Sequence, residues 1–182
     1  GCKYVVVGHS ERRGRFGTAD PSMTDELMSV FGDNDATVNR KAQAAAAAGL
    51  VPIICVGETP DERKSEQTDR VISEQVKAAL NGFGAEVVRQ LVIAYEPVWA
   101  IGTGDVCDTE EANRVIGLIR KNVEEATDDG AAGAIRLLYG GSVKPDNVDA
   151  IMAQPEIDGT LVGGASLEAE PFARIARAGK KA

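Results

Sequence analysis

The sequence lacks the residues from which metal sites and disulfide frameworks are built. It contains one histidine and three cysteines among 182 residues. Cys2, Cys55 and Cys107 lie far apart, and neither a C-x-x-C nor an H-x-x-x-H spacing occurs. We therefore expect no metal site and no cofactor. An odd number of cysteines is typical of thiols that are kept reduced in a cytosol.

Long hydrophobic runs are also absent. No segment approaches the roughly 18 uninterrupted apolar residues of a membrane span, and the opening Gly1-Cys2-Lys3-Tyr4 does not resemble a signal peptide. These features predict a cytoplasmic location. Acidic residues outnumber basic ones, 28 to 20, and the formal net charge is −8. This balance argues against nucleic acid and membrane partners, which select basic patches. An anionic ligand would need a locally positive site.

The composition, with 43% hydrophobic and 26% charged residues, is typical of one globular domain, expected over residues 1–182. Short apolar runs alternate with segments of helical spacing, which predicts parallel strands joined by right-handed crossovers. The expected strands are Lys3–Val7, Val51–Val56, Leu91–Tyr95, Ile135–Tyr139 and Gly159–Val162. The expected helices are Asp35–Ala48, Asp61–Leu80, Thr109–Ala126, Asn147–Ala153 and Leu167–Ala178.

Two polar residues lie just beyond predicted strands, Glu96 directly after its strand and His9 one residue further on. Glu96 comes after Leu91–Tyr95 and precedes a loop that begins with proline and ends with glycine, and His9 follows Lys3–Val7. Ligands of parallel sheets bind at the carboxyl ends of the strands, so both are candidate site residues. By pattern alone, an isolated glutamate or histidine in such a place is more often structural or solvated. A helix that starts after His9 would disfavour imidazolium and keep the ring neutral.

Four segments, in order along the chain, together resemble the signature motifs of the triosephosphate isomerase family. They are Gly8-His9-Ser10-Glu11-Arg12-Arg13, Ala94–Gly104 with Glu96 at its third position, Tyr139-Gly140-Gly141-Ser142-Val143 and Gly159–Leu167. The resemblance runs through essentially the whole sequence but covers only the later part of the family's chain. A complete barrel usually takes about 250 residues. The expected fold is therefore α/β, a truncated TIM (β/α) barrel with about five parallel βα units in place of eight.

The resemblance also implies a reaction and its residues. Glu96 would be the general base that moves a proton between adjacent carbons, and His9 would donate a hydrogen bond to the enediolate. The implied substrate is a small phosphorylated triose, so the chain would interconvert dihydroxyacetone phosphate and glyceraldehyde 3-phosphate in glycolysis and gluconeogenesis. The implied substrate-binding residues are Gly102, Ser142, Gly163 and Gly164. Backbone N–H groups at such positions can bind a phosphate without a basic side chain.

The resemblance begins after the family's first strand, so the segment that corresponds to that strand is not in this sequence. The family's first strand carries an Asn-x-Lys motif whose lysine stabilises the enediolate, and loss of such a stabiliser typically costs about 10² to 10³ in rate. The alternative is therefore a catalytically inactive, self-associating barrel fragment that at most binds phosphates. Open sheet edges on Lys3–Val7 and Gly159–Val162 predict a homo-oligomer through an interface that the family does not use.

Overall fold

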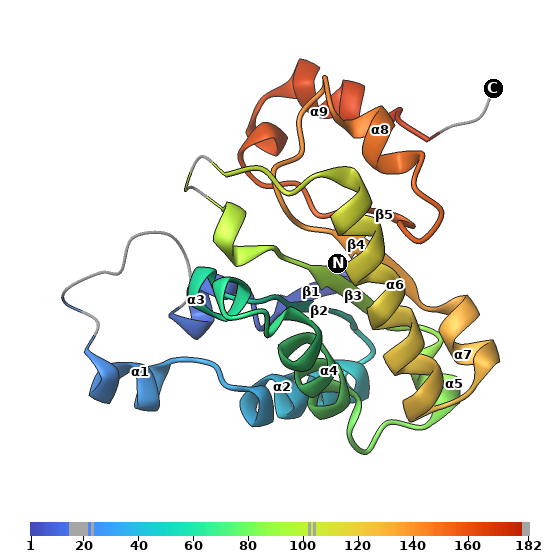
Figure 1. The fold of residues 1–182 in the computed structure, drawn as a ribbon. Coiled ribbons are helices and arrows are strands. Elements are labelled where there is room, and N and C mark those ends of the chain that lie inside the picture. The colour runs from blue at the N-terminus through green and yellow to red at the C-terminus, as the bar shows by residue number, and fades with distance from the viewer. Residues whose placement is uncertain (15–21, 23, 102, 104, 180–182) are drawn as a thin grey trace.

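The computed structural model describes residues 1–14, 22, 24–101, 103 and 105–179. Its centre is a parallel five-stranded sheet in the order β1-β2-β3-β4-β5, which is also the order along the chain. The strands are β1 (Tyr4–Val7), β2 (Val51–Val56), β3 (Val92–Tyr95), β4 (Arg136–Tyr139) and β5 (Gly159–Thr160). In Figure 1 the strands lie in the middle of the molecule, with α2 and α4 below them and α8 and α9 above them. The α/β class and the parallel pairing are therefore confirmed.

Helices connect the strands, as parallel pairing requires. They are α1 (Asp25–Phe31), α2 (Asp35–Ala47), α3 (Pro60–Lys64), α4 (Thr68–Leu80), α5 (Ala85–Val88), α6 (Thr109–Ala126), α7 (Asp129–Ala134), α8 (Val148–Met152) and α9 (Ala169–Ala176). Three short 3₁₀ helices are η1 (Ser10–Arg13), η2 (Val98–Ala100) and η3 (Gly164–Leu167). None of the helices in the described part of the chain is long and apolar enough to cross a membrane.

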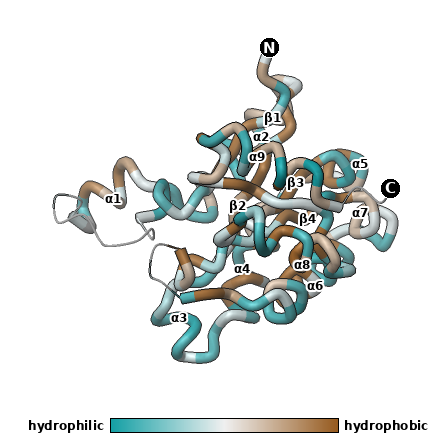
Figure 2. Tube along the Cα trace, turned by 90° about the horizontal axis from the view of Figure 1, so that it is seen from above, coloured by the Kyte–Doolittle hydropathy of each residue, from teal (hydrophilic) through white to brown (hydrophobic). Residues whose placement is uncertain are grey.

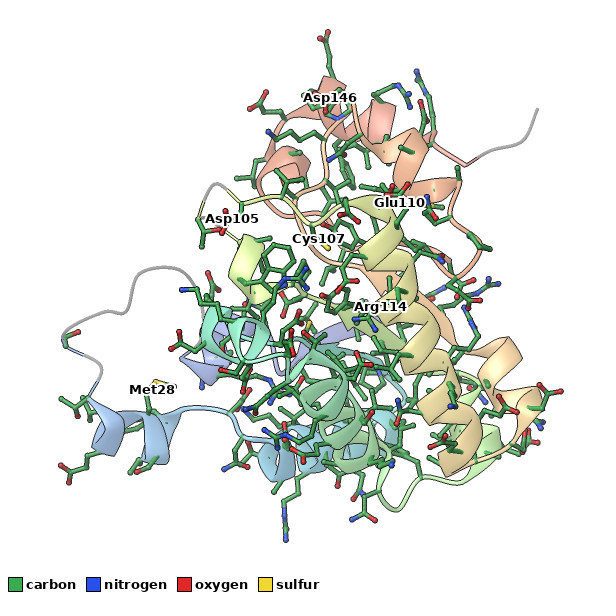
Figure 3. The ribbon with its side chains drawn as sticks, viewed as in Figure 1. Met28, Asp105, Cys107, Glu110, Arg114 and Asp146 are labelled. Carbon is green, nitrogen blue, oxygen red and sulfur yellow. The ribbon has the colours of Figure 1, made fainter. Side chains whose placement is uncertain are left out.

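One face of the sheet carries the core. Ile54, Ile93 and Leu137 are fully buried, and they point toward the layer formed by α2, α4 and α6. Figure 2 shows hydrophobic stretches along the strands and hydrophilic stretches on the outer helices. In Figure 3, Arg114 extends from α6, and its guanidinium donates to Asp69 of α4 at 2.8 Å. The packed layer of α2, α4 and α6 thus supports the sheet and fixes the positions of its strands.

The opposite face of the sheet is only partly covered. Val6 of β1 is 43% exposed and Tyr4 is 58% exposed. Helix α1 stands away from the sheet in Figures 1 and 2 and exposes Val30 and Phe31. On this second face Val6 lines an open cavity.

Several predicted boundaries were wrong. The segment predicted as one helix over Asp61–Leu80 forms α3 and α4, separated at Glu66, whose φ of 56° is left-handed. No residue of α3 is buried, whereas α4 buries an apolar stripe. The polar residues before Thr68 are not buried, so no buried contact favours an α4 that begins earlier. The predicted strand Gly159–Val162 is shorter in the structure, and α5 and α7 were not predicted.

Candidate active site

His9 follows β1 after a sharp turn at Gly8, and hydrogen bonds from Arg13 hold this turn in place. Gly8 has a φ of 70°, and a Cβ there would lie 2.8 Å from Val38, so this position requires glycine. Arg13 is braced across the strand ends, because its guanidinium donates to the carbonyls of Gly8 at 2.7 Å and Cys55 at 3.2 Å. The turn therefore holds His9 against the neighbouring strand ends.

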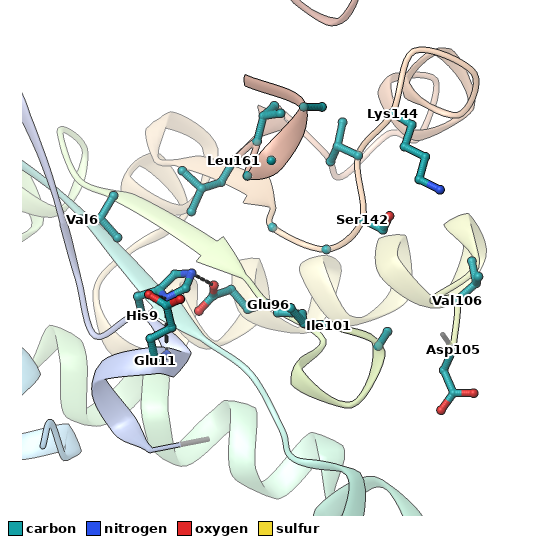
Figure 4. Close-up of a pocket in the computed structure, with 18 residues that line it drawn as sticks. Val6, His9, Glu11, Glu96, Ile101, Asp105, Val106, Ser142, Lys144 and Leu161 are labelled. Atoms are coloured by element: carbon teal, nitrogen blue, oxygen red, sulfur yellow. Dashed lines mark hydrogen bonds and ion pairs between the residues drawn. The ribbon is translucent and has the colours of Figure 1, made fainter. Parts of the chain in front are cut away.

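Glu96 follows β3, and its carboxylate is hydrogen-bonded to the same turn. Its Oε1 lies 2.8 Å from His9 Nε2, and its Oε2 accepts from the backbone N–H of Ser10 at 3.1 Å. Glu96 is only 2% exposed, whereas the imidazole of His9 is 31% exposed. The structure thus brings together the two residues predicted as base and hydrogen-bond donor. Figure 4 shows this pair at the inner end of a pocket.

The partners of His9 shift its pKa in the direction opposite to the one expected from the sequence. The hydrogen bond with Glu96 raises the pKa of His9 above 6.5, and partial burial of the ring opposes that shift. The backbone N–H of Glu11 donates to His9 Nδ1 at 3.3 Å, which leaves the proton of a neutral ring on Nε2. The expected effect of a helix start on His9 stays a prediction, and the carboxylate of Glu96 at 2.8 Å acts on the pKa of His9 in the opposite direction.

A cavity of about 770 Å³ lies beside this pair. Its lining includes His9, Glu96, Ser142, Gly163 and Gly164, so five of the six predicted site residues meet at one place. A Cβ on Gly163 or Gly164 would meet nothing within 4 Å, and the space beside these glycines is therefore open to a ligand. Gly102, the sixth predicted residue, lies outside the described residues.

Comparisons with known proteins identify the family of this chain. A model of the triosephosphate isomerase family matches residues 1–179. The chain belongs to this family. It is 51% identical to the triosephosphate isomerase of Herpetosiphon aurantiacus over 97% of this chain and 65% of that protein. It is 52% identical to the triosephosphate isomerase of a Nostoc species over 96% of this chain and 62% of that protein. The chain thus spans a little under two thirds of the length of these relatives.

Sequence reasoning missed Glu58, a buried carboxylate next to the site of this triosephosphate isomerase family member. Its Oε1 accepts from Trp99 Nε1 at 2.8 Å and from the hydroxyl of Tyr95 at 3.1 Å. Trp99 lies three residues after Glu96, so Glu58 anchors the start of the loop that follows the carboxylate. Glu58 comes two residues after β2, and the strand-end argument used for Glu96 would have found it.

Burial raises the pKa of Glu58, although the bonds from Trp99 and Tyr95 oppose the shift. The folded chain therefore binds this proton more tightly than the unfolded chain does. The stability that the proton provides is complete below the ordinary pKa of 4.5 and is lost as the pH rises through the folded pKa.

A Glu58→Gln variant should lose this component of the pH dependence. The unmodified chain loses the contribution of the Glu58 proton as the pH rises from about 4 to about 8, and the variant has no such contribution to lose. We therefore expect the variant to become more stable relative to the unmodified chain over this range, which means that its relative free energy of unfolding becomes larger. Urea unfolding across that range would measure the difference, and Glu124→Gln, at an exposed position of α6, provides the control. Parallel curves for the unmodified chain and the Glu58 variant would contradict the prediction.

Proposed function

We propose that this chain isomerises a phosphorylated triose, interconverting dihydroxyacetone phosphate and glyceraldehyde 3-phosphate. The observation that carries the proposal is the Glu96–His9 pair at 2.8 Å beside an open cavity lined by Ser142, Gly163 and Gly164. The relatives with about 50% identity are named triosephosphate isomerases. Family membership and site geometry thus favour the same reaction.

The chemistry needs a base and a hydrogen-bond donor at neighbouring atoms. Glu96 takes the proton from the carbon next to the carbonyl, and the electron pair of the broken C–H bond forms an enediolate. His9 Nε2–H donates to the developing oxygen anion. The hydroxyl proton of the neighbouring oxygen moves to this oxygen anion, which becomes a hydroxyl group. The carboxylic acid of Glu96 returns a proton to the carbon that carried the original carbonyl, and the neighbouring oxygen, now without its proton, forms the new carbonyl. In the structure Nε2 of His9 lies next to the carboxylate of Glu96. When substrate binds, its oxygen would replace that carboxylate as the acceptor of the Nε2–H hydrogen bond.

The phosphate would occupy the other side of the cavity. Ser142 follows β4, and Gly163 and Gly164 follow β5, so all three lie beyond the carboxyl ends of the last two strands. A barrel fold commonly binds phosphate at this position. We infer that backbone N–H groups there hold the phosphate, with Gly102 as a further proposed contact.

A His9→Gln variant separates the catalytic role of this residue from a structural one. We expect its kcat/KM to fall by about 10² to 10³, because one preorganised donor to the anionic intermediate is lost. The thermal midpoint should change little, because His9 is part-exposed and lies outside the apolar core. A coupled assay in both directions and a thermal melt measure these effects. A collapse of the melting temperature with unchanged turnover in the surviving folded fraction would contradict the role.

Three finer points remain proposals. We infer that the five described strands correspond to part of a (β/α)₈ barrel, since the sheet is parallel throughout and in sequential order. The expected cost of lacking the Asn-x-Lys lysine stays a prediction, and the absolute rate of this chain measures it. Self-association also stays a prediction, supported by the exposure of Tyr4 and Val6 on the edge strand β1.

A further inference from the structure

The charges around the cavity pose a difficulty for an anionic ligand. Among the described residues that line it, Glu11, Glu96 and Asp105 are acidic, and Lys144 alone is a lysine or arginine. The imidazole of His9 is already hydrogen-bonded to Glu96. A phosphate ester with two negative charges would thus approach a predominantly acidic cavity in a chain of net charge −8. Coulomb repulsion from these carboxylates would disfavour such an approach unless a cation near the phosphate-binding side of the cavity attracts the ligand.

Lys144 lies at such a place. It is two residues beyond Ser142, in the connection between β4 and α8. Figure 4 shows the side chains of Ser142 and Lys144 on the opposite side of the lining residues from His9 and Glu11. Asn147 fixes this connection, because its Oδ1 accepts from the N–H of Lys144 at 2.8 Å and its Nδ2 donates to the carbonyl of Ser142 at 2.9 Å. Within the part of the chain that the structure describes, the ammonium of Lys144 has no ion-pair partner. The backbone is therefore held while the charged end remains available.

We propose that Lys144 is a ligand-positioning cation that attracts the phosphate end of the substrate toward Ser142, Gly163 and Gly164. This inference rests on the proposed function, because it assigns the phosphate to that side of the cavity. The lysine is exposed, so its contribution is screened by salt and is modest. It orients a substrate whose reacting carbons must face Glu96, because the opposite orientation would place the phosphate against the carboxylates of Glu96 and Glu11.

Equilibrium binding of glycerol 3-phosphate, an unreactive phosphate ester, tests the role by calorimetry. We expect Lys144→Gln to weaken binding about 2- to 5-fold at low ionic strength, the range typical of one exposed charge. Lys144→Arg should retain most of the affinity, because it keeps the charge. Lys77→Gln removes an exposed lysine of α4 that does not line the cavity and should leave binding unchanged. The difference between the two glutamine variants should shrink as NaCl rises from about 20 to about 300 mM.

Asp105 provides a test of opposite sign. It lines the same cavity, so Asp105→Asn should strengthen binding of the same probe by a comparable factor. Equal affinities of the Lys144→Gln and Lys77→Gln variants at all salt concentrations would overturn the inference, as would equal losses in the arginine and glutamine variants of Lys144. Failure of the unmodified chain to bind the probe would overturn it too.

The isomerase assay keeps this inference distinct from the proposed function. If the chain turns over triose phosphates and Lys144→Gln changes neither KM nor probe affinity, the positioning role is wrong and the function stands. If Lys144 governs probe binding in a chain that does not isomerise, the positioning role stands and the proposed function is wrong.

Discussion

A Glu96→Gln variant is expected to lose nearly all isomerase activity, by roughly 10² to 10⁴-fold in kcat. Glutamine has the same shape and can still accept from the backbone N–H of Ser10, but it cannot take a proton from carbon. Affinity for glycerol 3-phosphate should stay within a few-fold, because the proposed phosphate contacts lie on the other side of the cavity. Steady-state kinetics and calorimetry on the same preparation measure both quantities.

The same variant has a second readout, because His9 is the only histidine of the chain and its NMR titration is therefore unambiguous. The hydrogen bond with Glu96 is the largest cause of the raised pKa of His9, so the titration midpoint should fall in Glu96→Gln. A Glu96→Asp variant keeps a shortened carboxylate and should retain partial activity. Activity that persists unchanged in both variants would come from a contaminating enzyme, and equal losses in turnover and binding would contradict the assigned role.

Gly57→Ala should be the most destabilising single-methyl addition near the site. A Cβ on Gly57 would lie 1.7 Å from the carbonyl oxygen of Glu96, a steric clash that the backbone could relieve only by moving. The two strand ends cannot easily separate, because the N–H of Glu96 donates to the carbonyl of Val56 at 2.8 Å. Buried Gln75 also clamps Gly57, accepting from its N–H at 2.8 Å and donating to its carbonyl at 3.2 Å. We expect a loss of about 3 kcal/mol or more in the free energy of unfolding.

Gly133→Ala is the matched control for this substitution. Gly133 lies in α7, and a Cβ there would meet nothing within 4 Å. Alanine in a helix is favoured over glycine by about 0.5 to 1 kcal/mol, so the control should be neutral or slightly stabilising. Urea unfolding compares the two variants. A Gly57→Ala chain as stable and as active as the control would show that the strand ends separate more freely than their hydrogen bonds indicate.

The strands, and the proximity of Glu96 to His9, could be predicted from the sequence. Apolar runs such as Val51–Val56 are largely buried in the structure, so the run of apolar residues was enough to predict a buried strand. Glu96 and His9 were predicted together because both follow strands, and parallel strands end at one edge of a sheet. Ser142, Gly163 and Gly164 came from the family resemblance, since single glycines are common in turns.

Other features depend on contacts that no local pattern contains. The raised pKa of His9 depends on the distance between its Nε2 and Glu96, residues far apart in sequence. The position of Glu58 after a strand is visible in the sequence, but its burial and its raised pKa depend on the packing around Trp99 and Tyr95. The short helices α5 and α7 have too few turns to show a helical spacing of apolar residues. The break before α4 depends on tertiary packing, because residues of α4 are buried whereas none of α3 is.

The setting of Trp99 makes it an optical probe. It is the only tryptophan of the chain, so intrinsic indole emission comes from a single ring. That ring is 9% exposed, its N–H donates to Glu58, and the guanidinium carbon of Arg63 lies 4.0 Å from its centroid. A cation over one face and a carboxylate at the edge both act on the excited-state dipole of the indole. Any rearrangement of the residues directly after Glu96 therefore changes the colour or intensity of the emission, and stopped-flow fluorescence can follow it without an added label.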